Sequence, residues 1–225
     1  MYLSKLVFLC VKNVLYFNDP SFNETDFLKG SFDNDSDYGT SINNVFQPLN
    51  TAIAVLSDYD LIPYRVESVK CLNGVIDLTK LEHECKEVVN VGCLFNGRHT
   101  KLEHADYGVN KVKLLRNSFT PTVDVEYKED IPTFERYDIP TKEFDKDKDE
   151  WVLNENDVDL KKEFGITETM CQYIIEFVQG KLLEPIAPEL ANLHKFNAEN
   201  CFKNMNVAKS LYRQKSITTM YRVGE

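Results

Sequence analysis

The chain has 225 residues, and 36 acidic against 26 basic residues give it a formal net charge of -10 at pH 7. A length of this order suits one large domain, or one body that carries a second, smaller lobe. The acidic balance argues against a dedicated nucleic-acid binder and against a protein that binds an anionic membrane surface, because both partners attract cationic side chains.

The N-terminal segment, residues 1–17, is apolar, but Lys5 and Lys12 bracket only a short apolar run. This run is too short for a signal peptide or a membrane span, and its periodicity predicts an amphipathic helix. Extracellular disulfide frameworks are dense and place their cysteines in loops, whereas the six cysteines here are scattered. We therefore expect an intracellular chain with reduced, buried thiols at positions 10, 71, 85, 93, 171 and 201.

A polar segment, residues 23–40, predicts a loop, and Ser41 is the expected N-cap of a second helix over residues 42–57. Pro48 lies inside this helical pattern and predicts either a bend or a later start. The residues expected on the inward face of this helix are Val45, Leu49, Ala52, Ile53 and Leu56.

From residue 64 to about residue 134 the period of the apolar pattern changes from helical to alternating, which predicts short strands divided by turns. The clearest alternation sets Val123, Val125 and Tyr127 against charged neighbours and predicts a half-exposed antiparallel strand. The charged run over residues 141–150 is expected to be a surface loop.

Residues 156–225 predict a helical hairpin followed by an extended tail. Apolar residues recur at steps of three and four in two stretches, which a turn with Pro185 and Pro188 divides. The first stretch contains Ile166, Met170, Ile174, Ile175, Val178, Leu182 and Leu183. The second contains Ala191, Ala198, Cys201, Phe202, Met205 and Ala208.

These patterns together predict an α+β fold: a helical bundle with a long C-terminal helical hairpin, an inserted antiparallel β-lobe and an extended tail. The helical body is assigned to residues 1–62 and 151–213, and the β-lobe with its charged loop to residues 63–150. The tail, residues 214–225, has strand propensity, and we expect it to add as a strand to another subunit. The tail residues expected to make this contact are Ile217, Met220, Tyr221 and Val223.

The chain contains no recognisable catalytic, cofactor-binding or metal-binding motif. Histidine and cysteine are zinc ligands, but the spacing of His83, Cys85, Cys93, His99 and His104 matches no zinc module. Two runs of alternate aspartates lack the glycine and the glutamate of a calcium loop, and there is no nucleophile elbow or glycine-rich phosphate loop. We therefore expect no enzymatic activity, no cofactor and no metal.

Two stretches resemble ring proteins of crAss-like, short-tailed phages, which belong to the head-to-tail connector (adaptor and ring) proteins of tailed bacteriophages. The first stretch is NVFQPLNTAIAVL at residues 44–56, with Ile-Pro-Tyr at residues 62–64. The second is FGITETMCQYIIEFVQGKL at residues 164–182, with the closing segment at residues 214–221.

The resemblance implies a structural virion protein that is assembled in the host cytoplasm. About twelve copies would form a ring between the portal protein and the tail, prolong the DNA channel and dock neighbouring ring and tail proteins. An acidic wall would let DNA pass without binding it specifically. Two alternatives stay open: a small zinc-dependent or hydrolytic enzyme that uses the His and Cys of the β-lobe, and a monomeric acidic adaptor or regulator of a host protein.

Overall fold

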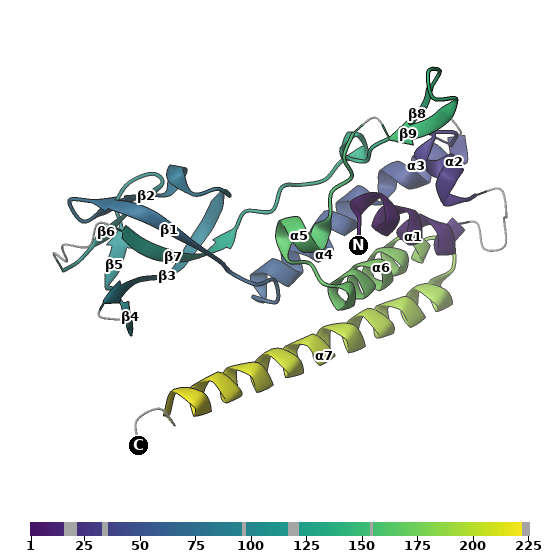
Figure 1. Ribbon diagram of the computed structural model, residues 1–225. Coiled ribbons are helices and arrows are strands. Elements are labelled where there is room, and N and C mark those ends of the chain that lie inside the picture. Colours follow the sequence, from purple (N-terminus) through teal and green to yellow (C-terminus); the bar gives the residue numbers. More distant parts are fainter. Residues whose placement is uncertain (16–21, 33–35, 96–97, 117–121, 154, 222–225) are drawn as a thin grey trace. The chain divides into compact units, whose positions relative to one another are not determined.

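The computed structural model describes residues 1–15, 22–32, 36–95, 98–116, 122–153 and 155–221 (Figure 1). They form helices and an antiparallel curled sheet, which confirms the α+β class. The chain divides into two units: a first unit of residues 1–62 and 133–225, and a second unit of residues 63–132. Residues 133–150, which the sequence analysis placed with the β-lobe, therefore belong to the first unit.

The first unit contains most of the helical segments. Its elements are α1 (Leu3–Leu15), α2 (Glu24–Leu28), α3 (Ser36–Asn44), α4 (Phe46–Asp58), η2 (Arg136–Asp138), β8 (Lys142–Asp145), β9 (Glu150–Leu153), α5 (Leu160–Phe164), α6 (Glu168–Leu183) and α7 (Pro188–Tyr221). Helix α1 confirms the N-terminal amphipathic helix, and its buried face carries Leu3, Leu6, Val7, Cys10 and Val11.

The loop predicted over residues 23–40 is wrong in two places. It contains α2, which Asn23 caps by accepting a hydrogen bond from the Asp26 N–H, and it contains the start of α3. Helix α4 begins at Phe46, so the Ser41 cap is wrong and the later start predicted from Pro48 is confirmed. Proline fits the first turn of a helix because an N–H there has no partner within the helix.

All five residues expected on the inward face of this helix are buried, which confirms that face. Four of them lie in α4 itself and the fifth, Val45, occupies the position just before it. The helical period therefore predicted the burial correctly, although the helix is shorter than expected.

The helical hairpin is confirmed as α6 and α7, which a turn after Leu183 joins (Figure 1). Helix α6 starts with a cap in which the Thr167 hydroxyl accepts a hydrogen bond from the Met170 N–H. Helix α7 continues for 34 residues to Tyr221, so the extended tail is wrong over residues 214–221. A helix pairs its own backbone groups, whereas a single strand needs an adjacent edge, and this favours the helix for an isolated chain.

The charged run at residues 141–150 forms most of a hairpin, β8–β9, and is not a plain loop. Phe144 and Trp151 face each other across its two strands, with ring centroids 5.7 Å apart. The Asp145 carboxylate accepts a hydrogen bond from the Asp147 N–H and so stabilises the turn. The sequence did not predict this aromatic pair, because charged residues surround both aromatic residues along the chain.

The second unit is an antiparallel sheet with the strand order β4-β3-β7-β1-β2-β6-β5. Its elements are β1 (Arg65–Leu72), β2 (Val75–Asp77), η1 (Leu78–Lys80), β3 (Cys85–Phe95), β4 (Arg98–Lys101), β5 (His104–Asp106), β6 (Lys111–Leu114) and β7 (Thr122–Glu129). Asn73 and Gly74 connect β1 to β2 with positive φ angles of 54° and 76°, as the tightest hairpin turns require.

The alternation predicted for residues 123–127 is confirmed in β7. Val123, Val125 and Tyr127 are buried, and the residues between them are half-buried. Together with Val69, Cys71, Ile76, Leu81, Val91, Val112 and Leu114, these three residues form the apolar core of the second unit.

Candidate functional site

The C-terminal residues expected to contact another subunit lie at the end of α7. Ile217, Met220 and Tyr221 belong to its last turns, and their side chains are outside the described residues. Val223 lies wholly outside the described residues. The structure therefore corrects the conformation expected for this segment and leaves its contacts as a prediction.

One face of α7 packs within the first unit. Ala191, Ala198 and Met205, spaced by seven residues, are buried on this face. Between α6 and α7, the Glu176 carboxylate lies 2.8 Å from Nδ1 of His194. A Cβ placed on Gly180 would lie 3.3 Å from the Lys195 backbone nitrogen, so the two helices approach closely at this glycine.

The end of α4 covers the middle of α7. The rings of Tyr59 and Phe202 meet edge to face with centroids 4.9 Å apart. Further along, the Lys209 ammonium donates a hydrogen bond to the Tyr59 carbonyl at 2.7 Å and lies 3.6 Å from the Asp60 carboxylate. These contacts hold α7 against the end of α4 at Lys209.

A second set of apolar side chains on α7 is exposed, and we call it the outer face. Its residues are Leu190, Leu193, Phe196 and Val207, each between 52% and 59% exposed. Phe196 and Val207 are eleven residues apart, which is close to three helical turns, so they project in nearly the same direction. Leu193 and Leu190 lie progressively further around one side of that direction. These four exposed apolar residues therefore lie on the side of α7 away from its buried stripe.

A groove opens where α4, α6 and α7 meet, and we call it the aromatic groove. Its volume is about 530 Å³, within the range of about 300–1,000 Å³ that is common for ligand sites. Four aromatic rings line it, from Tyr59, Tyr173, Phe177 and Phe202. Burial, and to a smaller extent the nearby Tyr59, raise the pKa of the Tyr173 phenol to about 12. The groove therefore disfavours the ionised form of this phenol.

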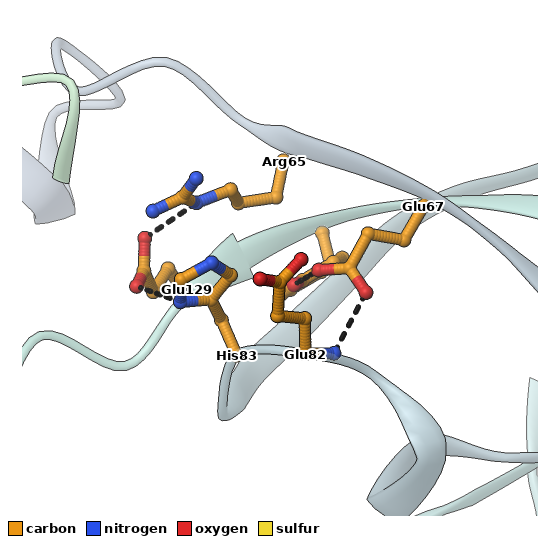
Figure 2. Close-up of polar contacts among 6 residues, drawn as sticks. Arg65, Glu67, Glu82, His83 and Glu129 are labelled. Carbon is orange, nitrogen blue, oxygen red and sulfur yellow. Dashed lines mark hydrogen bonds and ion pairs between the residues drawn. The ribbon is translucent and has the colours of Figure 1, made fainter. Parts of the chain in front are cut away.

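In the second unit, the buried row of β7 ends in a polar cluster (Figure 2). The Glu129 side chain is 7% exposed, and its two carboxylate oxygens have different partners. Arg65 Nε donates to one oxygen at 2.8 Å, and Nδ1 of His83 lies 3.1 Å from the other. A buried carboxylate is stable only when it is paired, so these two partners make its position possible.

Next to this pair, the buried Tyr127 hydroxyl donates a hydrogen bond to the Glu67 carboxylate, whose other oxygen accepts from the Glu82 N–H at 2.7 Å (Figure 2). Burial and the Glu67 carboxylate raise the pKa of the Tyr127 phenol well above its ordinary value. Burial lowers the pKa of Arg65, but the hydrogen bond and charge of Glu129 outweigh it and hold that pKa above its ordinary value.

The chemistry of this cluster is that of a satisfied charge network. Its carboxylates accept hydrogen bonds from a guanidinium, a phenol and a backbone amide, and the phenol is held in its neutral form. Sequence reasoning missed the cluster, although extending the alternation of Val123, Val125 and Tyr127 by one step places Glu129 on the buried face.

The histidines and cysteines considered for a zinc site have separate partners and environments. His83 is engaged by Glu129, Nδ1 of His104 lies 3.3 Å from the Leu102 carbonyl oxygen, and Cys93 is buried. Cys85 is half-buried, and the His99 side chain is outside the described residues. Across the part of the chain that the structure describes, no three His, Cys, Asp or Glu side chains are placed to hold a metal ion.

All six cysteines are free. Those at positions 10, 71, 93 and 171 are buried, as expected, and those at positions 85 and 201 are half-buried. Among the helices of the described residues, none combines the length and the apolar character that crossing a membrane requires. No protein-family model matches the chain, and a comparison with curated proteins finds no similar sequence.

Proposed function

We propose that the chain is a structural virion protein, many copies of which form a ring between the portal and the tail of a tailed phage. The sequence resemblance suggests this role, and the outer face of α7 is the observation that carries it. A helix with one buried apolar stripe and a second, exposed one is suited to packing between neighbouring subunits. In the proposed ring, the α6–α7 hairpin therefore lies at the subunit boundary, and the second unit faces the next tail component.

The energy of this contact is modest. Complete burial of a Leu, Val or Phe side chain contributes about 1.5–3 kcal/mol, and the four outer-face residues are already about half covered, which leaves on the order of 3–6 kcal/mol. Association costs about 4–15 kcal/mol of lost translational and rotational freedom. The outer face alone would therefore bind weakly, and a ring needs either a second contact or a template such as the portal.

The acidic net charge fits the same role. A ring of subunits that each carry a charge of -10 would surround a channel with negative potential. Such a wall would repel the phosphate backbone and would not hold DNA through the counterion release that drives non-specific binding. The genome could then pass without stalling.

Two measurements test the proposal. The first is an electron-microscopy map of virions of the phage that encodes the chain, in which we expect a ring of this fold between portal and tail. A map that accounts for that position with other proteins alone would overturn the proposal. The second is metal analysis of the purified protein, because zinc in stoichiometric amount would favour the enzyme alternative.

A variant pair tests the outer face itself. Leu193→Glu with Phe196→Glu should leave the fold intact and abolish assembly, since two charges would face an apolar partner surface. Val66→Glu with Leu72→Glu is the matched control, because it places the same change on exposed apolar residues of β1 in the second unit. Equal self-association of the two variants, measured by mass in solution, would contradict the role of α7.

A further inference from the structure

The aromatic groove of the first unit has the character of a site for an apolar side chain. Tyr173 is almost fully buried and forms its floor, with the Phe202 ring 5.6 Å and the Phe177 ring 5.9 Å away. A second hollow of about 410 Å³ shares Phe177 and Lys181 with it and continues along α4. The combined depression is therefore long enough to take a short segment of chain.

The rim of the aromatic groove is positive in a protein that is strongly acidic overall. Lys181, Lys195 and Lys203 line it, against a single acidic lining residue, Glu199. Lys203 lies 3.6 Å from Glu199, and Lys195 and Lys181 lie 2.7 Å and 3.8 Å from the single carboxylate of Glu184. Two carboxylates therefore offset most of the charge of the three lysines and leave one positive charge. The remaining positive charge favours an occupant that is acidic around an apolar centre.

The β8–β9 hairpin has that chemistry. Its residues 142–153 include five acidic and three basic side chains, and they surround the Phe144–Trp151 pair. Phe144 is 44% exposed and Trp151 is 46% exposed, although the Lys29 ammonium lies 5.0 Å from the centre of the Trp151 ring. Large aromatic side chains are the usual anchors of protein interfaces, because they bury much area at little entropic cost.

The hairpin does not fill the groove of its own chain. Within the first unit, β8 and β9 lie beyond α2 and α3, well away from α7 (Figure 1). A contact between hairpin and groove therefore joins two copies. Because the two surfaces differ, the contact is head-to-tail, and such contacts generate rings when the rotation between subunits closes.

We propose that the β8–β9 hairpin of one copy docks into the aromatic groove of the next, with Trp151 over the aromatic floor and the acidic hairpin against Lys181 and Lys203. This rests on the proposed ring and names its second contact, which adds to the weak contact of the outer face. Two contacts made by the same pair of subunits reinforce each other, because the first raises the effective concentration for the second.

The chain contains one tryptophan, so its fluorescence reports on the hairpin directly. As the purified full-length protein is concentrated, docking of Trp151 should shift its emission to the blue, and zero-length carbodiimide cross-linking should join hairpin carboxylates to Lys181 or Lys203 between copies. Emission and cross-links that stay unchanged up to the solubility limit would overturn the inference.

Charge exchange separates a direct contact from an effect on folding. Lys181→Glu with Lys203→Glu reverses the rim, and Asp147→Lys with Glu150→Lys reverses the hairpin without changing Asp145, which stabilises its turn. Each pair alone should weaken self-association about tenfold or more, because like charges then face each other across the interface. All four changes in one chain should restore it, since the charges are complementary again.

The matched control is Lys70→Glu with Lys101→Glu, which changes the net charge equally on exposed residues of the second unit. It should associate as the unchanged protein does. Failure of the fourfold variant to recover would overturn the inference. If virions contain the ring and the ring still assembles with either reversed pair, the proposed function would stand. Only the contact between hairpin and groove would then be wrong.

Discussion

The side-chain amide of Asn50 binds both backbone groups of Phe134. Its nitrogen donates to the Phe134 carbonyl at 3.0 Å, and its oxygen accepts from the Phe134 N–H at 2.9 Å. Asn50 lies in α4, and Phe134 lies where the chain returns to the first unit after the second. The Phe134 ring is 3% exposed and packs on Phe164 with centroids 5.8 Å apart, so this amide holds the returning segment in register with the core.

Asn50→Asp should therefore destabilise the first unit by about 1–3 kcal/mol, because a carboxylate cannot donate to the Phe134 carbonyl and leaves it unpaired. Urea unfolding followed by Trp151 fluorescence measures this, since the tryptophan belongs to the same unit. Thr51→Ala, which removes an exposed hydroxyl on the same helix, should change the stability by less than about 0.5 kcal/mol. Equal midpoints for the two variants would show that the double contact is unimportant.

Gly180 should accept alanine but not valine. The added Cβ would meet Lys195 Cγ at 3.1 Å and the Lys195 backbone nitrogen at 3.3 Å, so a single methyl requires a shift of the lysine side chain and a few tenths of an ångström of movement in α7. Alanine also gains up to about 1 kcal/mol of helix propensity over glycine, and the net change should be near zero. Valine brings two further methyl groups against α7 and should cost about 1–3 kcal/mol by overpacking. Thermal unfolding of both variants tests this, and a stable valine variant would mean that the helices are not closely packed there.

Removing the charge of Glu129 should destabilise the second unit. Glu129→Gln removes the negative charge that pairs with Arg65 and His83, and we expect a loss of about 1–3 kcal/mol. Hydrogen exchange of the β7 amides, read by mass spectrometry, measures this locally. Glu126→Gln lies on the half-buried face of the same strand and is the control, with an expected change below about 0.5 kcal/mol. Exchange that is equally fast in both variants would contradict a stabilising role of the pair.

Alkaline pH should unfold the first unit in part through Tyr173. Burial raises the pKa of its phenol from 10.0 to about 12, so between these values the unfolded chain has lost the proton and the folded chain keeps it. The unfolded state then binds fewer protons, and stability falls as pH rises, by up to about 1.4 kcal/mol per pH unit for this group. Below pH 10 the stabilising contribution is fully present.

Tyr173→Phe should make the pH dependence shallower between pH 10 and 12. The remaining slope comes in part from the buried thiols, because burial also raises the pKa of Cys171, to about 11, and that of Cys10. Urea midpoints measured at steps of pH compare the variant with the unchanged protein. The same slope in both would mean that the Tyr173 phenol is not shifted.

Deletion of residues 214–225 should leave a folded chain that no longer joins its ring or the portal. The deletion begins after Lys209, whose contacts with Tyr59 and Asp60 remain. Deletion of residues 205–225 removes these contacts together with the buried Met205, and should cost about 2–5 kcal/mol. Circular dichroism and mass measurement distinguish the two truncations. Unfolding of the shorter deletion would place residues 214–225 in the core.

The local pattern of apolar residues was enough to predict the α+β class, the α6–α7 hairpin, the buried face of α4 and the alternation in β7. These features depend on which side chains share a face, and the period of the chain reveals that directly. The β8–β9 hairpin was not predicted, because charged residues surround its two aromatic residues in the sequence. The helical end of α7 was not predicted, because a helix pairs its backbone groups within one segment and can continue through β-prone residues.

Tertiary structure alone decided the pairings between distant residues. Arg65 is sixty-four positions from Glu129, and Asn50 is eighty-four positions from Phe134, so no local period relates them. The aromatic groove arises only where α4, α6 and α7 meet. Side chains brought together by folding create desolvated contacts whose strength depends on geometry, and geometry of that kind is not encoded in the spacing of any one segment.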